Sequence, residues 1–504
     1  MHLNYCFAVI LTLHFMTVSY CFIHNNKLPS RHNVVLVLVD DLRHLSDENV
    51  NLPNIHKLAK TGIHFKNAFA QQSLCAPSRN SLLTGRRPDS LRLYDFYSYW
   101  RETVGNFTTL PQLFKQNGYH TYSVGKVFHP GVSSGYTDDY PYSWSTKPYH
   151  PPSEVYKNSP VCYDILTKKL QKNLICPVDV FNQPRHTLPD IQILNRAVNV
   201  LNKVKKSEQP FLLAVGFHKP HIPFKFPMEY LEKYPLDSIT PKHPFIPKGM
   251  PLVSYHPWTD IRERDDIMRL NLTFPFATMP ELWSKKIIQG YYASASFVDD
   301  LIGQLIRNVD LENTVVVLTS DHGWSLGENG LWAKYSNFDV ALKVPLIFHY
   351  PNVTHKEIDT PVELIDIFPT IADIAGFKNI PKCNNKNEEL CFDGKNILKH
   401  INNNIALSQY PRPSVYPKYN SDKPKLKDIR IMGYSIRTNR FRFTMWVDLN
   451  NTNFVRNWSI VYGTELYDHN YDKYETKNLY NFPYFKDLCN HFSVLLRNKV
   501  EGYN

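Results

Sequence analysis

Two runs of β-branched and other apolar residues, far apart in the chain, constrain the fold more than any other feature. Residues 33–39 read Asn-Val-Val-Leu-Val-Leu-Val, and residues 314–319 read Thr-Val-Val-Val-Leu-Thr. Continuous apolar runs of this length are typical of strands that are buried on both faces of a parallel sheet. We therefore expect two central strands that come from opposite parts of the chain.

Shorter strand-like and helix-like segments lie between and around these two runs. Strand candidates at 211–215 and 344–348 alternate with helical patterns at 191–204 and 285–309. Such alternation is typical of α/β proteins, and 43% apolar residues are enough for a packed core. We expect a large mixed, mainly parallel sheet that is sandwiched by helices.

The pattern changes after about residue 377. An Asn-rich stretch and a Pro-rich stretch are followed by strand-like segments at 431–438 and 442–447. We expect a catalytic domain at 30–377 and a smaller C-terminal subdomain at 378–504 that contains an antiparallel sheet.

The first twenty residues have the pattern of a leader. An apolar stretch from Cys6 to Val18 is followed by polar residues, and its length suits a signal peptide better than a membrane span of ~20 residues. No later segment is apolar over that length, so we predict a signal peptide at 1–20, no membrane anchor and passage through the secretory pathway. Five Asn-x-Ser/Thr sequons agree with this prediction: Asn106, Asn271, Asn352, Asn450 and Asn457.

The cysteines fit an oxidising compartment. Cys162 with Cys176, and Cys383 with Cys391, would each close a short local loop by a disulfide. Cys75 has no obvious partner, which leaves two interpretations: a buried apolar side chain or a reactive group.

The formal charge of +11 is only weak evidence for an acidic substrate. The basic residues are spread along the chain, with no run of five or more like charges and no nucleic-acid-binding motif. We therefore predict no nucleic-acid partner.

Acidic residues follow both central strands. Asp40 and Asp41 come after the first, and Asp321 and His322 come soon after the second. Open α/β sheets place ligands at the carboxyl ends of their strands, so these side chains are expected to meet there. Adjacent carboxylates repel unless a cation neutralises them, and oxygen ligands suit Ca²⁺ or Mg²⁺. The alternative is that each acid caps a turn or a helix.

The segment Cys75-Ala-Pro-Ser-Arg79 has the pattern of a helix N-terminus that binds an anion. Pro77 suits the first turn of a helix, and residues four apart share one helix face. The free N–H groups of that turn and the guanidinium of Arg79 together suit a sulfuryl or phosphoryl group.

Together with Leu-Thr-Gly-Arg at 83–86, this segment resembles the signature of the type I sulfatases, which belong to the alkaline-phosphatase superfamily. In that family the signature directs conversion of the cysteine to formylglycine. Longer blocks are similar to the members that act on the 2-O-sulfate of iduronate. These blocks are residues 68–72, 86–89, 93–96, 98–101, 123–131, 214–224, 332–340, 409–413, 421–424 and 432–438.

The resemblance implies an alkaline-phosphatase-like fold and a set of site residues. One Ca²⁺ ion would be bound by Asp40, Asp41, Asp321, His322 and the modified Cys75. Arg79, Lys126 and Lys334 would hold the sulfate oxygens, with His129 and His218 as proton-transfer residues. Lys423 would bind the uronate carboxylate, and Trp324 would line the substrate pocket.

The resemblance also implies partners and a location. The substrate would be a sulfated glycosaminoglycan, heparan sulfate or dermatan sulfate, and a formylglycine-generating enzyme would modify Cys75. The protein would be lysosomal, with secretion as the alternative.

A hydrated aldehyde, as in formylglycine, suits the reaction because one of its hydroxyl groups can attack sulfur while the other allows sulfate to be expelled.

Two other functions remain open at this stage. A phosphohydrolase of the same superfamily would share the fold and the metal-binding strand ends, but would use Ser or Thr as its nucleophile and usually a second metal. A catalytically silent homologue would bind glycosaminoglycan without turnover. Taken one at a time, a lysine such as Lys126 or Lys334 is more often surface charge, and a histidine such as His129 or His218 could simply satisfy hydrogen bonds in a loop.

Overall fold

The computed structural model describes residues 32–44, 50–378, 380–384, 388–401 and 405–502. Contacts group Asn33–Asn504 into one compact unit, and the division of this unit at residue 377 stays a prediction. The predicted signal peptide lies outside the described residues. Among the residues that are described, no helix is both long enough and apolar enough to cross a bilayer.

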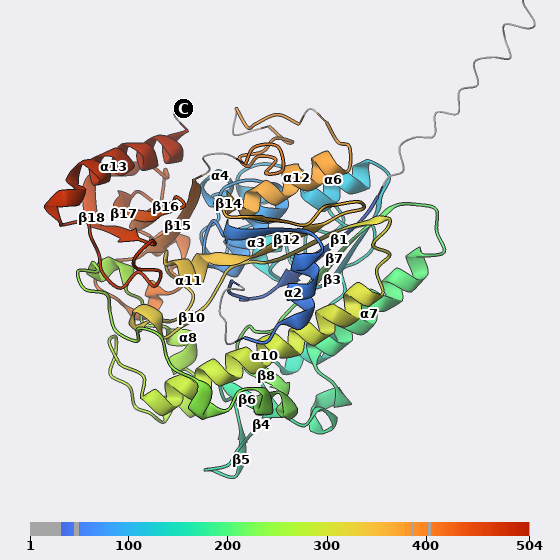
Figure 1. Cartoon of the computed structure of the whole chain (residues 1–504), viewed down its shortest axis with the longest axis horizontal. Helices are drawn as coiled ribbons and strands as arrows, with labels where there is room; N and C mark the ends of the chain where they lie inside the picture. The colour runs from blue at the N-terminus through green and yellow to red at the C-terminus, as the bar shows by residue number, and fades with distance from the viewer. Residues whose placement is uncertain (1–31, 45–49, 379, 385–387, 402–404, 503–504) are drawn as a thin grey trace, which may run out of the picture. The chain divides into compact units, whose positions relative to one another are not determined.

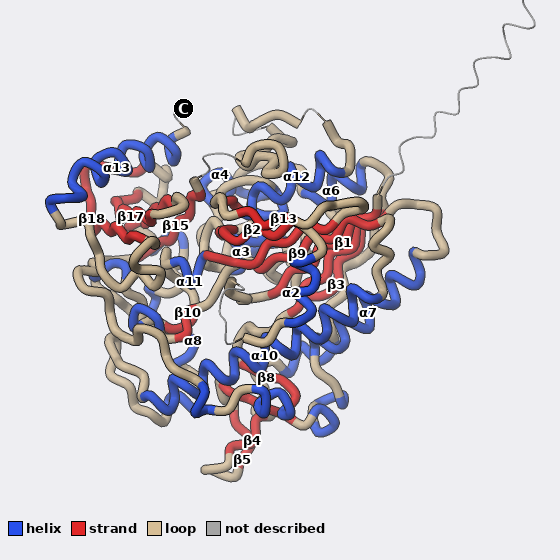
Figure 2. The backbone as a smooth tube through the Cα atoms, in the orientation of Figure 1, coloured by secondary structure: helices blue, strands red, loops and turns tan. Residues whose placement is uncertain are grey.

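Both predicted central strands are present as neighbours in one eight-stranded sheet (Figure 2). From one edge to the other the strands are β13 (Lys356–Ile358), β2 (Ile63–Phe69), β12 (Lys343–His349), β9 (Thr314–Ser320), β1 (Asn33–Val39), β7 (Phe211–Phe217) and β3 (His120–Gly125), and β14 (Val362–Glu363) also pairs with β2. β12 runs antiparallel to both β9 and β2, and the other pairings are parallel. The expected mixed, mainly parallel sheet is confirmed.

Helices cover both faces of this sheet (Figure 1). Side chains alternate between the faces of a strand, so Val35 and Val37 pack on one side while Val34 and Leu36 pack on the other. The first side is covered by α2 (Pro53–Lys60), α7 (Pro189–Val204) and α10 (Glu281–Arg307). The second side is covered by α3 (Cys75–Thr84), α6 (Leu110–Gln116) and α12 (Ile367–Ile374).

The second sheet is antiparallel, as the sequence predicts. Its strands are β15 (Ala406–Arg412), β16 (Ile431–Arg437), β17 (Phe441–Leu449) and β18 (Arg456–Asp468), and α13 (Lys486–Glu501) packs against it. β15 is joined to the main sheet region by the N–H of Gln409, which donates to the carbonyl of Gln71 at 2.8 Å. Buried Arg442 pairs with Asp339 and Glu475, which ties the same two regions together.

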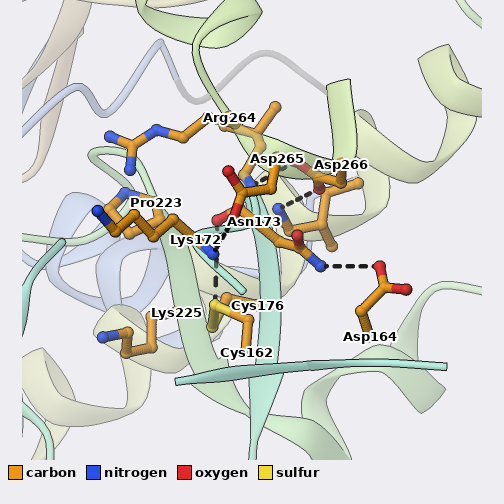
Figure 3. The surroundings of a disulfide bond; sticks show 12 residues. Cys162, Asp164, Lys172, Asn173, Cys176, Pro223, Lys225, Arg264, Asp265 and Asp266 are labelled. Atoms are coloured by element: carbon orange, nitrogen blue, oxygen red, sulfur yellow. Dashed lines mark hydrogen bonds between the residues drawn. A yellow bond between two sulfur atoms is a disulfide. The ribbon is translucent and has the colours of Figure 1, made fainter. Parts of the chain in front are cut away.

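Both predicted disulfides are present, Cys162–Cys176 and Cys383–Cys391. The first links β4 (Cys162–Asp164) to β6 (Ile175–Val178), and its surroundings are drawn in Figure 3. β6 pairs in parallel with β8 (Phe224–Pro227), so this disulfide supports the chain just after the 214–224 block. Cys75 and Cys489 are free and buried.

Short elements complete the fold. Among the described residues the remaining α-helices are α4 (Pro88–Leu91), α5 (Trp100–Thr103), α8 (Thr259–Arg262), α9 (Asp265–Met268) and α11 (Asp339–Leu342), and the remaining strands are β5 (Lys169–Gln171), β10 (Ser325–Leu326) and β11 (Trp332–Ala333). Several short 3-10 helices lie between these elements.

Candidate active site

The carboxyl ends of β1 and β9 bring four predicted ligands together. The backbone N–H of Asp41 donates to Asp321 Oδ1 at 3.0 Å. His322 Nε2 lies 3.4 Å from Asp41 Oδ1 and 3.6 Å from Asp321 Oδ2. Asp40 is the fourth of these residues, and all four side chains are fully buried. The expectation that these distant residues meet at the sheet edge therefore agrees with the structure.

Cys75 lies at the start of α3 and points into this acidic group. Its Sγ is 3.4 Å from His322 Nε2 and 3.1 Å from Lys334 Nζ. The hydroxyl of Ser78, in the first turn of the same helix, donates to the backbone carbonyl of Asp321. α3 is therefore joined directly to the end of β9, which fixes the position of Cys75.

Arg79 connects the two acidic strand ends. Its Nε donates to Asp321 Oδ2 and its Nη2 to Asp40 Oδ1, both at 2.9 Å. Burial opposes the charge of Arg79, but the carboxylates of Asp321 and Asp40 outweigh it and raise the pKa of the guanidinium. Arg79 is thus a fixed cation at the base of the site.

Two buried lysines complete the positive charge around Cys75. Lys126 Nζ donates to Asp40 Oδ2 at 2.5 Å, and Lys334 Nζ donates to Asp41 Oδ1 at 2.7 Å. Burial opposes both charges, but Asp40 and Asp41 raise the pKa values of Lys126 and Lys334. The backbone of Lys126 passes so close to residue 216 that only glycine fits there, because a Cβ atom at Gly216 would lie 1.9 Å from the Lys126 carbonyl oxygen.

The donor set fits a hard divalent cation. Oxygen, nitrogen and sulfur atoms of Asp41, Cys75, Asp321 and His322 all lie within 4.8 Å of one another. Asp41 Oδ2 is buried without a hydrogen-bond partner, and burial raises the pKa of Asp41. His322 Nδ1 lies 3.0 Å from the carbonyl oxygen of Gly323, which leaves Nε2 to face the site. An additional cation would satisfy the unpaired Oδ2 atom of Asp41, and His322 Nε2 faces the same place.

The two predicted proton-transfer histidines lie beside these charges. Burial and the nearby Lys126 ammonium hold the pKa of His129 well below its usual value, and its ring centre is 4.5 Å from that of Phe96. Burial lowers the pKa of His218 to about 3, and its Nε2 lies 3.6 Å from Glu154 Oε2. Asp40 interacts electrostatically with both imidazoles.

The two predicted substrate contacts differ in accessibility. Lys423 donates to Asp260 Oδ1, and 35% of its side chain is exposed. Trp324 has no exposed surface and packs against Phe224, with the ammonium of Lys334 5.8 Å from its ring centre. Trp324 is thus fully buried next to Lys334, and a direct contact between Trp324 and substrate stays a prediction.

Four residues near the site are absent from the sequence-based set. His221 joins Asp40, Asp41 and Cys75 in a second group of close ligand atoms. Glu154 faces His218, and Asp260 pairs with Lys423. Burial and Lys126 lower the pKa of Lys157 to about 8. His221 could have been found, since it lies in the 214–224 block, whereas the other three lie in or next to short helical turns without a motif.

Comparison with known proteins defines the class. The model of the sulfatase family matches residues 32–377. A second model, that of the C-terminal region of N-sulphoglucosamine sulphohydrolase, matches residues 327–501. The chain belongs to the sulfatase family and is a sulfuric ester hydrolase.

Within that family the chain is similar to iduronate 2-sulfatase. It is 48% identical to the protein of that name from Homo sapiens over 516 residues, which cover 92% of this chain and 94% of the human protein. It is 46% identical to the Mus musculus protein over 508 residues, which cover 90% and 92% of the two chains.

The fold also occurs in a solved phosphonate monoester hydrolase from Silicibacter pomeroyi. The TM-score is 0.69 at 18% identity, and the match covers 93% of this chain and 95% of the other. At that identity the likeness concerns the fold alone.

Proposed function

We propose that this sulfatase hydrolyses the 2-O-sulfate ester of iduronate in heparan sulfate and dermatan sulfate. The observation that carries the proposal is the position of Cys75, which contacts Lys334 and His322 within the acidic group. The 48% identity to human iduronate 2-sulfatase supports the choice of substrate. A phosphohydrolase is less well supported, because a cysteine occupies the position where that class would use Ser or Thr.

The proposed cofactors are one Ca²⁺ ion and a formylglycine made from Cys75. Asp40, Asp41, Asp321 and His322 would hold the ion with the modified residue, which agrees with the unpaired Asp41 Oδ2. The ion would neutralise the carboxylates and polarise a sulfate oxygen. Formylglycine would provide an oxygen nucleophile at the place where Cys75 Sγ now lies.

The protein's own cations are placed to bind the sulfate group. Arg79, Lys126 and Lys334 are each held by a carboxylate, so their N–H groups are oriented before substrate arrives. Donors that are fixed in advance stabilise the charge that develops on the sulfate oxygens. We assign His218 the role of the acid that protonates the leaving sugar oxygen, and His129 the role of the base that accepts a proton as sulfate is released.

Recognition of the sugar is assigned to the second part of the chain. Lys423, in the proposed subdomain 378–504, would pair with the uronate carboxylate in exchange for Asp260. This contact is how the subdomain would contribute to the substrate pocket. Trp324 would support the pocket through its contact with Lys334.

Maturation is proposed to follow the secretory pathway to the lysosome, with secretion as the alternative. Two disulfides agree with an oxidising compartment, and the asparagines of all five sequons are exposed: Asn106, Asn271, Asn352, Asn450 and Asn457. A signal peptide at 1–20 and modification of Cys75 by a formylglycine-generating enzyme are parts of the same proposal.

The proposal is tested by measuring the release of sulfate from two sulfate esters and the release of phosphate from a phosphate ester. Purified protein is incubated with a disaccharide that carries a terminal 2-sulfoiduronate, a disaccharide that carries 6-sulfoglucosamine, and an aryl phosphate. We expect release from the first substrate and little from the other two. Turnover of the aryl phosphate alone would favour the phosphohydrolase, and binding of the first substrate without turnover would favour the silent homologue.

A further inference from the structure

A chain of three ionisable side chains leads away from His218. Glu154 Oε2 lies 3.6 Å from His218 Nε2 and 3.4 Å from His150 Nδ1. His150 Nε2 in turn lies 2.7 Å from Asp138 Oδ2. Glu154 belongs to the 3-10 helix η2 (Pro152–Tyr156), so a segment outside the main sheet contacts the proposed acid.

The outer part of this chain holds Glu154 in its charged form. Burial opposes the charge of His150, but the carboxylates of Asp138 and Glu154 raise its pKa to about 10. Burial also opposes the charge of Glu154, but His150 and His218 lower its pKa to about 2. Asp138 is fixed through its backbone, because its carbonyl accepts from Trp144 Nε1 at 2.7 Å. Glu154 therefore presents a carboxylate to His218 at acidic and neutral pH.

The other charged groups around His218 come from several elements. Lys126 and Lys157 lower its pKa, whereas Glu154 and Asp40 raise it. The backbone N–H of His218 donates to Asp190 Oδ1 at 2.6 Å, which fixes the main chain but not the ring. Within the described structure, His218 Nε2 is buried and makes no hydrogen bond, so the facing carboxylate of Glu154 is the group that can orient the ring.

We propose that Glu154 is a positioning residue for His218, orienting the imidazole and stabilising its protonated form. The inference rests on the proposed function. As the sulfur–oxygen bond to the sugar breaks, protonated His218 gives its proton to the leaving oxygen and becomes neutral. His218 then regains a proton from solvent, and Glu154 stays ionised throughout. The arrangement resembles a catalytic triad, in which a carboxylate fixes the ring that transfers the proton.

A comparison of leaving groups distinguishes a role of Glu154 in proton transfer from a merely structural role. A sugar alcohol leaves poorly without a proton, whereas a nitrophenol leaves readily as its anion. Loss of Glu154 should therefore slow cleavage of an alkyl sulfate ester much more than cleavage of an aryl sulfate. It should also lower the pKa of His218, so the rate on the alkyl ester should begin to fall at a lower pH.

The experiment compares Glu154→Gln with Glu154→Asp and with Glu208→Gln, an exposed control in the turn after α7. Rates are measured on the 2-sulfoiduronate disaccharide and on nitrophenyl sulfate as a function of pH. We expect Glu154→Gln to lower kcat on the disaccharide about 10- to 100-fold, part of the usual contribution of a general acid. Its rate on nitrophenyl sulfate should change little. Glu154→Asp should restore part of the loss, and Glu208→Gln should match the wild type.

Two results would overturn the inference. An equal loss on both substrates would mean that Glu154 supports the fold rather than the proton transfer, and an unchanged pH profile on the disaccharide would mean that it does not act on His218. A wild-type protein that cleaves other alkyl sulfate esters but not the disaccharide would refute the proposed substrate alone. In that case the comparison of alkyl with aryl esters still tests Glu154.

Discussion

Replacement of Lys423 by alanine tests how the site recognises a uronate. Lys423 Nζ donates to Asp260 Oδ1, and Asp260 Oδ2 accepts from the hydroxyl of Tyr335. About a third of the Lys423 side chain is exposed, so a substrate carboxylate can reach the ammonium. The carboxylate of iduronate would then replace Asp260 as a partner of Lys423.

The expected size of the effect follows from this geometry. A hydrogen bond between charged groups contributes about 1.5–3 kcal/mol, which corresponds to about a 10- to 150-fold change in kcat/KM. Lys423→Ala also leaves the charge of Asp260 facing the substrate, and like charges repel. The double variant Lys423→Ala with Asp260→Asn removes this repulsion, so it should be more active on the disaccharide than the single variant.

The assay compares sulfate release from the 2-sulfoiduronate disaccharide with release from an uncharged aryl sulfate. Lys423→Ala should raise KM for the disaccharide and leave KM for the aryl sulfate nearly unchanged. Lys425→Ala, two residues further along and exposed, is the matched control and should resemble the wild type. An equal loss on both substrates would refute the role of Lys423 in binding the carboxylate.

Two further predictions concern the metal site and acid stability. Ca²⁺ should raise the midpoint of thermal unfolding of the wild type, and should raise it less in Asp41→Asn, because the amide keeps the shape of the carboxylate but loses its charge. An equal rise in both proteins would show that Asp41 is not a ligand. Burial opposes ionisation of Asp89, but Arg456 lowers the pKa of Asp89 in the folded state below 3.8. The pair of Asp89 and Arg456 therefore stabilises the fold above that pH, and this stabilisation is lost as the pH falls and Asp89 becomes protonated. Arg456→Gln should therefore lower the free energy of unfolding by about 2 kcal/mol at neutral pH and by less at pH below 3.8, as measured by urea unfolding. The same loss at both pH values would contradict this role.

The central part of the fold could be predicted because its strands are buried on both faces. β1 and β9 are continuous apolar runs, and the structure places them side by side. The strand β2 was not predicted, since His64, Lys66 and Asn67 interrupt its apolar pattern. Its place in the sheet comes from pairing with β12, which is a tertiary contact rather than a local signal.

The site could be predicted only where a motif or a strand end marks it. Asp40 and Asp321 follow buried strands, and Cys75 lies in a signature with fixed spacing. Glu154 and Asp260 come from short helical turns in long irregular segments, where no periodic pattern indicates which turn will fold over the site. Their roles depend on charge pairs with residues distant in sequence, and only the folded structure brings those pairs together.

The central claim is that the working nucleophile is made from Cys75. Trypsin would release residue 75 in the peptide spanning 67–79, between Lys66 and Arg79. Mass spectrometry of this peptide, from protein purified from its native source and active on the 2-sulfoiduronate disaccharide, measures the chemical state of residue 75. We expect a peptide lighter than the encoded one by the difference between a CH₂–SH group and an aldehyde. An unmodified thiol throughout an active preparation would contradict the claim.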